Sequence, residues 1–369
     1  MTQVTVETAV QSSFRVQQVA GMFDLPQTKT LRETFRAELP SLDESWRIGA
    51  IVGPSGSGKS TLARAAYAQH FYAPRAWQRD AAIVDGFGEL PIETITRTLT
   101  AVGFGSPPSW LKPFHVLSTG EQFRCELARA LLDAGDAQPN ACVVFDEFTS
   151  VVDRTVAQIA SAAITRSIHA GHLATRFVAV SCHRDILPWL EADWVFDTAT
   201  GKLTRGRLRR PCIELDLRLA RHAAWPAFAR HHYLSGSLSR AATVYLATWR
   251  GQPVALCAVV AMYGHAGRRR IHRLVTLPDF QGVGVGSRLL DATAAVQRDA
   301  GRRVNITSSH PAVIAHCRRS DAWRAVQLRR TGGGRQAKDG AAIRDSRGRA
   351  TVSFEFIGGA NPLQSRKPT

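Results

Sequence analysis

The segment that decides how the first half of this chain is interpreted is Gly53-Pro54-Ser55-Gly56-Ser57-Gly58-Lys59-Ser60. It follows the apolar run 48–52 and leads into 61–66, a stretch with helical character. A strand, a glycine-rich loop and a helix in this order are the context in which G-x-x-x-x-G-K-[ST] binds phosphate. The glycines let backbone N–H groups curl around a polyphosphate, and the helix N-terminus adds its dipole. We expect the polyphosphate to be contacted by Gly53, Ser55, Gly56, Gly58, Lys59, Ser60 and Thr61.

Polar residues follow two further apolar runs of the same half. The run 142–145 ends in Asp146 and Glu147, and the run 177–181 ends close to His183. The carboxyl ends of parallel strands meet at one edge of a sheet. We therefore expect these three side chains to converge on the glycine-rich loop, with Ser60 and Asp146 placed to hold Mg²⁺.

Together these motifs resemble those of an ABC-type ATPase domain over residues 1–205. Walker A is 53–60, Walker B is 142–146, the D-loop runs to Asp153, and the signature is Leu117-Ser118-Thr119-Gly120-Glu121. The resemblance implies ATP and Mg²⁺ as cofactors and Ser118 and Gly120 as nucleotide contacts. It also implies Glu147 as the catalytic glutamate and His183 as the switch histidine. Because such sites are completed by the signature of a second subunit, it implies an ATP-dependent homodimer.

Two features depart from the usual ABC pattern. The signature has Thr119 and Glu121 where the family usually has Gly and Gln, and Lys59 and Ser118 are only 59 positions apart. Gln78 and Asp85, the latter after an expected strand 81–84, are both candidates for the Q-loop residue. The reduced Q-loop region favours an ABC ATPase that is not part of a transporter. Upstream, we expect antiparallel strands at 14–19 and 31–39, with Phe23 a possible adenine-stacking residue.

Charge is distributed unevenly along the chain. Residues 206–369 contain 28 Lys and Arg against 9 Asp and Glu, a balance of +19. Residues 1–205 contain 19 basic and 21 acidic residues, a balance of −2. A basic domain beside a neutral one favours a nucleic-acid partner, since phosphates attract Lys and Arg. Binding of a CoA ligand, or solubility alone, is the alternative explanation. The basic strip includes Arg268–Arg270, Arg318-Arg319, Arg329-Arg330 and the stretch Arg335–Arg349.

Other features of the composition bear on the compartment. The six cysteines are scattered without a C-x-x-C pair, and no apolar run reaches 18 residues. The N-terminus has no basic start followed by an apolar core. We therefore expect a cytoplasmic protein with no secretion signal and no membrane span.

The second half repeats the strand, glycine turn and helix arrangement. Two expected strands, 242–249 and 253–263, flank a hairpin turn, and a third expected strand, 270–277, precedes Gln281-Gly282-Val283-Gly284-Val285-Gly286-Ser287 and a helix. A helix is also expected over 225–234. N–H groups of such a turn can face a pyrophosphate at the helix N-terminus.

Residues 206–369 resemble the GNAT acyltransferase fold. Its R/Q-x-x-G-x-G/A motif is matched by Gln281, Gly284 and Gly286, and 304–309, 310–319 and 350–357 match the later strand, helix and closing strand. The fold class is therefore α/β, an ABC-type P-loop NTPase domain followed by a GNAT-fold α+β domain. The resemblance implies acetyl-CoA or another acyl-CoA as cofactor. Its contacts would be Val275, Gln281, Gly282, Gly284, Gly286 and Ser287.

The acyltransferase chemistry is less well defined by sequence. The usual Glu base and Tyr acid are absent, because this half has only Glu214 and Glu355 and no Tyr on the helix 310–319. His272 and Ser308 are the catalytic candidates, with His310, Cys317 and the cluster His231-His232-Tyr233 as further possibilities. Histidine has a pKa suited to a general base at neutral pH. A metal site at the histidines is not expected.

The stretch 231–236, with Arg273-Leu274-Val275 before the glycine turn, is similar to phage Mom-type GNAT proteins, which modify adenine in DNA. This resemblance implies a DNA-base amino group as acceptor. Two alternatives stay open at this point: an ATP-driven DNA-binding protein whose GNAT domain is non-catalytic, and an N-acetyltransferase of a small-molecule or protein amine.

Overall fold

The computed structural model describes residues 2–26, 29–135, 141–232, 236–330 and 350–358. Contacts between Cα atoms divide the chain into two compact units. The first comprises residues 1–74, 133–150 and 174–209, and the second comprises residues 75–132, 151–173 and 210–369. The domain boundary predicted between residues 205 and 206 follows the sequence motifs. The division by contacts differs from it, because two segments that precede residue 205 belong to the same compact unit as the second half. We call these segments, 75–132 and 151–173, the helical insert.

The first unit is built on a five-stranded sheet with the order β4-β5-β3-β6-β7. β4, β5, β3 and β6 are parallel, and β7 is antiparallel to β6. All residues of β3 and β4 are buried, as expected for parallel strands covered on both faces. The elements of the sheet and its helices are β3 (Ile48–Val52), α2 (Lys59–Tyr67), β4 (Cys142–Phe145), β5 (Arg176–Ser181), α7 (Leu187–Leu190), β6 (Trp194–Asp197) and β7 (Lys202–Arg205).

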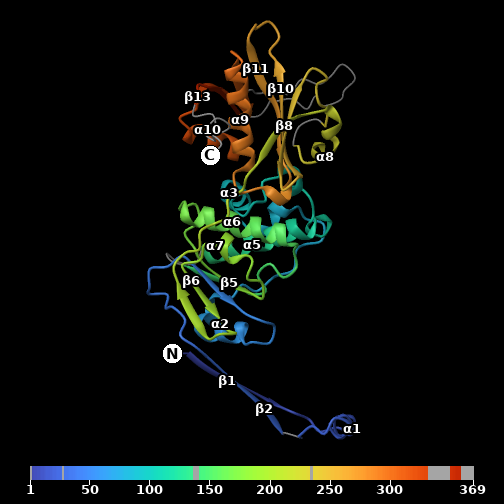
Figure 1. The fold of residues 1–369 in the computed structure, drawn as a ribbon, viewed down its shortest axis with the longest axis vertical. Coiled ribbons are helices and arrows are strands. Elements are labelled where there is room, and N and C mark those ends of the chain that lie inside the picture. The colour runs from blue at the N-terminus through green and yellow to red at the C-terminus, as the bar shows by residue number, and fades with distance from the viewer. Residues whose placement is uncertain (1, 27–28, 136–140, 233–235, 331–349, 359–369) are drawn as a thin grey trace, which may run out of the picture. The chain divides into compact units, whose positions relative to one another are not determined.

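A two-stranded antiparallel ribbon precedes this sheet (Figure 1). It consists of β1 (Thr2–Ala9) and β2 (Thr30–Ala37), and the segment between them contains α1 (Phe14–Met22). The strand expected at 31–39 is thus confirmed in β2, and the strand expected at 14–19 is wrong. Ser13 accepts a hydrogen bond from the Val16 amide at 3.3 Å, an N-cap that starts a helix there.

The helical insert contributes the helices of the second unit that come first in the chain. They are α3 (Ile92–Ala101), α4 (Pro107–Trp110), α5 (Thr119–Gly135), whose last residues belong to the first unit, and α6 (Arg154–His169). The strand expected at 81–84 is wrong, because Ile83–Phe87 is a 3-10 helix. The Asp85 amide donates to the Ala82 carbonyl at 3.0 Å and closes a turn instead of a strand ladder.

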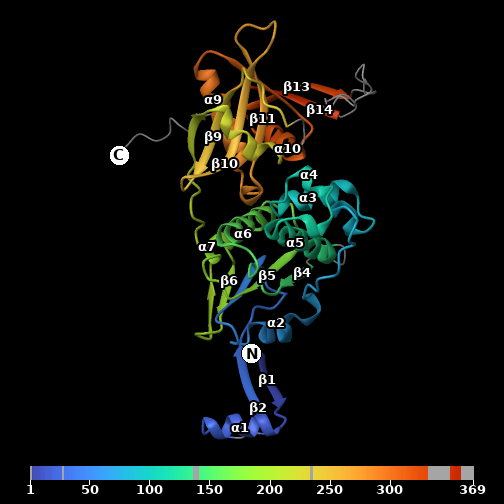
Figure 2. The same cartoon turned by 90° about the vertical axis from the view of Figure 1, so that its right-hand side faces the viewer.

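The remainder of the second unit is a seven-stranded sheet with the order β13-β14-β12-β11-β10-β9-β8. Helix α9 packs on one face, and α8 covers the other through Trp225 and Phe228 (Figures 1 and 2). Its elements are β8 (Asp216–Ala220), α8 (Pro226–Ala229), β9 (Thr243–Trp249), β10 (Gln252–Ala261), β11 (Arg268–Thr276), α9 (Val285–Asp299), β12 (Arg303–Ser308), α10 (Pro311–Arg319), β13 (Trp323–Arg330) and β14 (Ala350–Phe356).

The expected hairpin is confirmed in β9 and β10, whose turn places Arg250 and Gly251 at φ of 50° and 78°. The helix expected over 225–234 is shorter, since α8 spans only Pro226–Ala229 and residues 233–235 lie outside the described residues. The strand expected at 350–357 is confirmed in β14, which inserts between β12 and β13.

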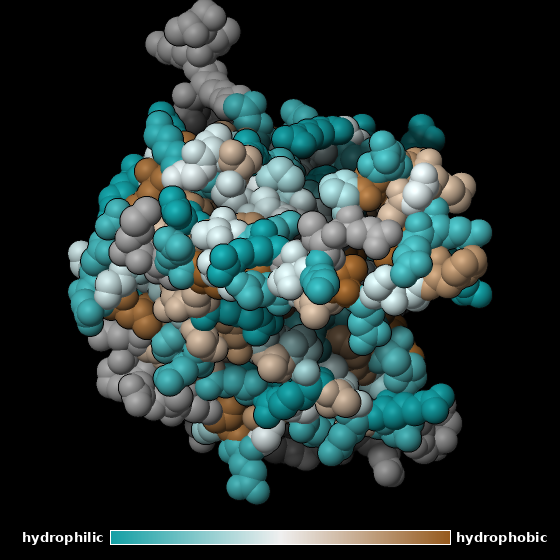
Figure 3. Space-filling model, turned by 90° about the horizontal axis from the view of Figure 1, so that it is seen from below, coloured by the Kyte–Doolittle hydropathy of each residue, from teal (hydrophilic) through white to brown (hydrophobic). Residues whose placement is uncertain are grey.

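The face shown in Figure 3 is predominantly hydrophilic, with apolar side chains scattered singly or in small groups. Over the described ranges, no helix combines the length and the apolar character needed to cross a bilayer.

Candidate nucleotide and acyl-CoA sites

The glycine-rich loop at the end of β3 has a backbone that requires glycine. Gly56 and Gly58 have φ of 76° and 79°, a region that L side chains rarely adopt. A Cβ on Gly58 would also collide with the ring of Phe35 on β2. Lys59 and Ser60 then begin α2, so the loop leads directly into a helix N-terminus as expected.

The side chains of the loop are arranged around a cavity of about 270 Å³. The Lys59 Nζ donates to the Pro54 carbonyl at 2.7 Å, so the ammonium group is held over its own loop. The Ser60 Oγ donates to Asp146 Oδ1 at 2.9 Å. The two side chains expected to hold Mg²⁺ are therefore adjacent, although they lie 86 positions apart in the chain.

Glu147 and His183 follow neighbouring parallel strands, β4 and β5. Glu147 lines the same cavity as the loop, and its Oε2 accepts a hydrogen bond from the Ser150 Oγ at 2.6 Å. Its φ of 51° is unusual for a residue with a side chain and marks the turn that follows β4. The His183 amide donates to the Ser181 Oγ at 3.1 Å. β4 pairs in parallel with β5, and β5 pairs in parallel with β3, so the carboxyl ends of all three strands lie at one edge of the sheet.

The aromatic residue at this cavity is one that the sequence did not single out. Phe35 on β2 lines the cavity, whereas Phe23 is 67% exposed and is not among the lining residues. The sequence could not predict that β2 packs on the glycine-rich loop, because this contact depends on the tertiary structure. The signal that could have identified Phe35 is its position in the strand that precedes β3.

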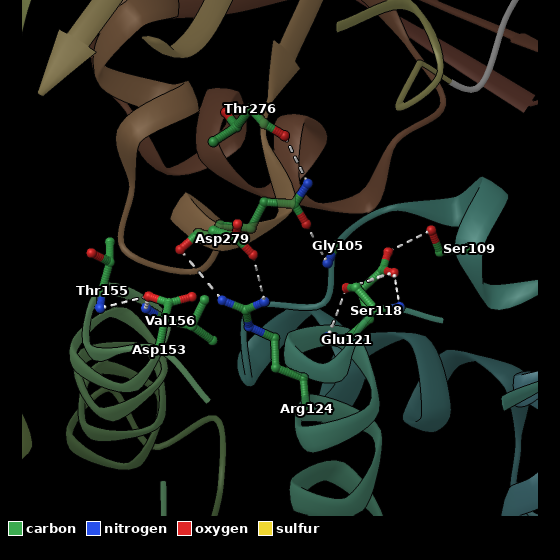
Figure 4. A network of polar contacts seen from close by, with 11 residues as sticks. Gly105, Ser109, Ser118, Glu121, Arg124, Asp153, Thr155, Val156, Thr276 and Asp279 are labelled. Carbon is green, nitrogen blue, oxygen red and sulfur yellow. Dashed lines mark hydrogen bonds and ion pairs between the residues drawn. The ribbon is translucent and has the colours of Figure 1, made fainter. Parts of the chain in front are cut away.

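The signature residues form the N-terminus of α5. The Ser118 amide and Oγ both donate to the Glu121 Oε2, at 3.1 and 3.0 Å, and the Glu121 amide donates back to Ser118 Oγ at 3.4 Å (Figure 4). This reciprocal arrangement is a capping box. The other carboxylate oxygen accepts from Ser109 Oγ at 2.8 Å. Glu121, the departure from the usual Gln, thus engages the hydroxyl of Ser118 and places a negative charge beside it.

The candidate acyl-CoA site lies where two strands of the second sheet separate. β11 pairs in parallel with β12 only from Arg268 to Ile271, and β12 then continues against β14 alone. From His272 onward, the edge of β11 is no longer hydrogen-bonded to β12. Val275 is buried in the core, so it can offer only its backbone to a ligand. The separation opens the sheet beside the turn Gln281–Gly286.

The turn itself meets close neighbours on both sides. Gly282 and Gly284 have φ of 86° and 89°, and α9 begins at Val285. A Cβ on Gly286 would lie 2.7 Å from Thr276 Oγ1, so glycine is also required where the helix meets the end of β11. Ser287 lies in the first turn of α9. The side chain of Gln281, a residue expected to contact acyl-CoA, donates to the Thr276 carbonyl at 2.8 Å and accepts from the Gly105 amide at 2.7 Å.

The helical insert packs against this turn, a contact that the sequence did not predict. Arg124 on α5 is fully buried; its Nη2 donates to the Asp279 carbonyl at 3.3 Å, and its Nη1 lies 3.8 Å from the Asp279 carboxylate (Figure 4). Burial lowers the pKa of Arg124 and raises the pKa of Asp279. The attraction between the two charges opposes both of these shifts. The signature helix is thus joined to the residues that precede the glycine turn.

Three histidines gather where β11 and β12 separate. Ala258 pairs with Arg273 and Val259 with Ile271, so His272 is the extra residue of a β-bulge. Burial, reinforced by Arg273 and Arg270, lowers the pKa of His272 to about 4. Burial also lowers the pKa of His232 to about 3, with further contributions from Arg273, His272 and His310. Both imidazoles are therefore neutral at pH 7. Within the described residues, no group of three His, Cys, Asp or Glu side chains is placed to hold a metal ion.

The other candidates have defined structural roles. Ser308 is buried, and its Oγ accepts from the His310 amide at 3.0 Å. His310 accepts from the Ala312 amide at 3.2 Å through Nδ1, and its Nε2 lies 3.1 Å from the Gly105 carbonyl. Because both ring nitrogens are engaged, His310 is not placed to act as a base. Burial raises the pKa of the Cys317 thiol to about 12, so it is a poor nucleophile.

Glu355 is not an alternative base. Although burial raises its pKa, hydrogen bonds from Arg303 and Arg324 lower the pKa below its ordinary value. The two guanidinium groups lie 2.5 and 3.3 Å from its carboxylate oxygens. Tyr233 and the stretch 335–349, both named from sequence, lie outside the described residues, as do the side chains of Arg329 and Arg330.

The buried histidines predict how stability depends on pH. In the unfolded chain His232 takes up a proton near the ordinary histidine pKa of 6.5, whereas its pKa in the folded chain is about 3. The unfolded state therefore binds more protons between these values, and stability is lost as the pH falls from about 6.5 toward 3. We expect His232→Gln to flatten the fall in unfolding free energy between pH 7 and 4, measured by urea titration. The matched control His265→Gln, at an exposed position, should keep the original slope. An unchanged slope in His232→Gln would contradict the prediction.

Comparison with known proteins agrees with this geometry. Residues 240–318 match the family model described as an acetyltransferase (GNAT) domain, a stretch that contains β9 to β12 with the turn and α9. The second half therefore contains a GNAT acetyltransferase domain. The expected α/β fold class is confirmed, because a mostly parallel sheet with a glycine-rich loop precedes a GNAT-fold α+β domain.

Solved structures of both kinds are similar to this chain. The ribosomal-protein-S18-alanine N-acetyltransferase from Escherichia coli is 16% identical, with 40% of this chain and 98% of that chain covered at a TM-score of 0.30. A GNAT acetyltransferase from Elizabethkingia anophelis with acetyl-CoA bound is 9% identical, with 38% and 97% covered at 0.30. A dimeric bacterial ABC transporter cassette is 14% identical, with 49% and 94% covered at 0.35. No curated protein matches the sequence.

Proposed function

We propose that this protein is an ATP-dependent, acyl-CoA-dependent N-acyltransferase whose acceptor is an amino group of a nucleic-acid base. The observation that carries the acyltransferase part is the glycine turn at the N-terminus of α9, beside the open edge of β11. Two positive φ angles and a Cβ-excluding contact at Gly286 make this turn a cradle for a phosphate group. The residues thus fit acyl-CoA, which when bound would supply the acyl group as a reactive thioester.

The residues at the strand separation define what the protein itself would contribute. The acceptor amine nitrogen forms a bond to the thioester carbonyl carbon, the carbon–sulfur bond breaks, and the amine proton leaves. His272, neutral at pH 7 and placed at the bulge of β11, would accept that proton, and the thiolate is protonated on release. Its low pKa keeps it unprotonated but also limits its strength as a base. Ser308 retains a hydroxyl proton to donate.

The ATPase part rests on the contact between Ser60 and Asp146 and on the Lys59 ammonium held over its loop. The hydroxyl and carboxylate oxygens are ligands that suit Mg²⁺, and the loop amides and Lys59 suit ATP phosphates. We propose that hydrolysis takes place in an ATP-dependent homodimer, with Glu147 orienting the attacking water. The capping box predicts that ATP holds the two subunits together only weakly. The Ser118 hydroxyl, which would contact the nucleotide, already donates its hydrogen bond to Glu121.

The nucleic-acid acceptor is supported by charge. Residues 206–369 carry a net charge of +19. Among their few acidic residues, Glu355 is already paired with Arg303 and Arg324. A base inside a duplex would have to be flipped out or single-stranded to reach the site.

Binding of the full chain to DNA across a salt series tests this acceptor. We expect affinity for duplex and single-stranded DNA to fall about 10³-fold or more between 50 and 200 mM salt, as for six or more phosphate contacts. Adding acetyl-CoA and ATP should then yield acylated bases detectable by mass spectrometry, and none without acetyl-CoA. Binding of acetyl-CoA without DNA binding would move the acceptor to a small or protein amine.

A second function has one observation in its favour. In the described part of the domain, His310 and Glu355 are both held in structural contacts, so the site has no strong general base. A GNAT domain that only recognises its ligand would explain this. Tight acetyl-CoA and DNA binding without acyl transfer to any base would favour that function.

A further inference from the structure

An arginine of the helical insert lies directly against the glycine turn. Arg166, on α6, donates from Nη1 to the Gly282 carbonyl at 3.3 Å. A Cβ on Gly284 would lie 2.8 Å from the same Nη1, so the guanidinium group lies directly against the turn. Ala163, one turn earlier on α6, would be 2.6 Å from a Cβ on Gly282. One face of α6 therefore lies along the turn.

Other cations surround Arg166. After burial, which is the largest cause, the charges of Arg210, Arg319 and Arg288 lower the pKa of Arg166. Arg288 lies in the first turn of α9, just after the glycine turn. Arg319, at the end of α10, has its Nη1 3.1 Å from the His172 Nε2. The cluster thus combines residues of the GNAT domain with residues of the helical insert.

Three arginines of the cluster have no carboxylate partner among the described residues. Within them, no carboxylate forms an ion pair with Arg166, Arg288 or Arg319. Guanidinium groups do not lose their protons in proteins, so their mutual repulsion is relieved only by an anion or by solvent. Guanidinium groups also match phosphate geometry closely. The position beside a phosphate-binding turn makes a polyphosphate the matching ligand.

We propose that Arg166, together with Arg288 and Arg319, binds phosphate groups of acyl-CoA, so that the helical insert of the ATPase completes the acyl-CoA site. The inference rests on the proposed acyl-CoA function and adds to it a residue from outside the GNAT domain. Acyl-CoA carries a pyrophosphate and a further ribose phosphate, which is enough negative charge for several arginines. Nucleic-acid phosphates share this chemistry, and the experiment must separate the two sources.

Calorimetric binding to the full chain tests the proposal. We expect Arg166→Gln to weaken acetyl-CoA binding about tenfold, because one exposed charge-assisted contact to phosphate is lost. Binding of S-acetyl-pantetheine, which lacks the phosphates, should be the same in both proteins. Arg298→Gln is the matched control, since Arg298 is exposed in the last turn of α9, at the end remote from the glycine turn. It should bind acetyl-CoA like the unmodified chain. Arg288→Gln is a second variant and should show the same selective loss.

Each other outcome counts against the proposal in a distinguishable way. Unchanged acetyl-CoA affinity in Arg166→Gln, or an equal loss for S-acetyl-pantetheine, would overturn it while leaving the proposed function in place. Loss of DNA affinity with acetyl-CoA affinity intact would assign the cluster to nucleic acid and also overturn it. If the unmodified chain binds no acetyl-CoA, the proposed acyl-CoA function fails, and the proposal fails with it.

Discussion

Replacing Gly284 by Val is expected to abolish acetyl-CoA binding and all acyl transfer. Gly284 has a φ of 89°, which costs a side chain about 1–2 kcal/mol, and its Cβ would meet the Arg166 guanidinium. A branched side chain would displace the arginine and distort the turn whose amides are proposed to hold the pyrophosphate. Calorimetric titration with acetyl-CoA measures the loss, and far-UV circular dichroism shows whether the fold is kept.

Gly301 offers a matched control for this variant. It follows the other end of α9 and also has a positive φ, 74°, but a Cβ there would meet nothing within 4 Å. Gly301→Val carries the same backbone strain without the collision, so it should be less stable yet still bind acetyl-CoA. Normal acetyl-CoA affinity in Gly284→Val would show that the turn is not the binding site.

Replacing Lys59 by Ala is expected to lower ATP hydrolysis by about 10²-fold or more, the loss seen when a preorganised charge-stabilising donor is removed. Lys59 is 9% exposed and has its Nζ 2.7 Å from the Pro54 carbonyl, so the ammonium group is already held over the loop. Steady-state phosphate release measures hydrolysis, and a fluorescent ATP analogue measures affinity. The matched control is Lys202→Ala, since Lys202 is exposed on β7. Hydrolysis that survives in Lys59→Ala would exclude the glycine-rich loop as the ATPase site.

The contact between the helical insert and the glycine turn would connect the two proposed activities physically. Ser118 and Glu121 cap the helix that carries Arg124 one turn later, and Arg124 holds the backbone of Asp279. Gln281 meanwhile bonds Gly105 of the insert and the end of β11. Any ligand that moves the start of α5 would act on the residues that precede the glycine turn.

The conformation of the two glycine motifs was predictable from sequence because it is local. A loop that needs positive φ at several glycines and leads into a helix can be identified without tertiary information, as at 53–60 and 281–286. The adjacency of Ser60 and Asp146 was also predictable, because parallel strands deliver their carboxyl ends to one edge. The alternation of apolar residues at 14–19 wrongly predicted a strand. These residues form a helix, which Ser13 caps at its N-terminus.

Only the tertiary structure decided what surrounds these motifs. Strand register and contacts between distant segments decide three features of the sites. Phe35 packs on the glycine-rich loop, His272 lies in a β-bulge, and Gln281 hydrogen-bonds to Gly105. The same is true of Arg166. In the sequence it is one charged residue of a helix, and only the tertiary structure places it beside Gly282 and Gly284. Sequence thus determined the two glycine-rich loops, because each is specified by its own backbone. Packing between distant segments determined which side chains reach them, because long-range contacts leave no local pattern.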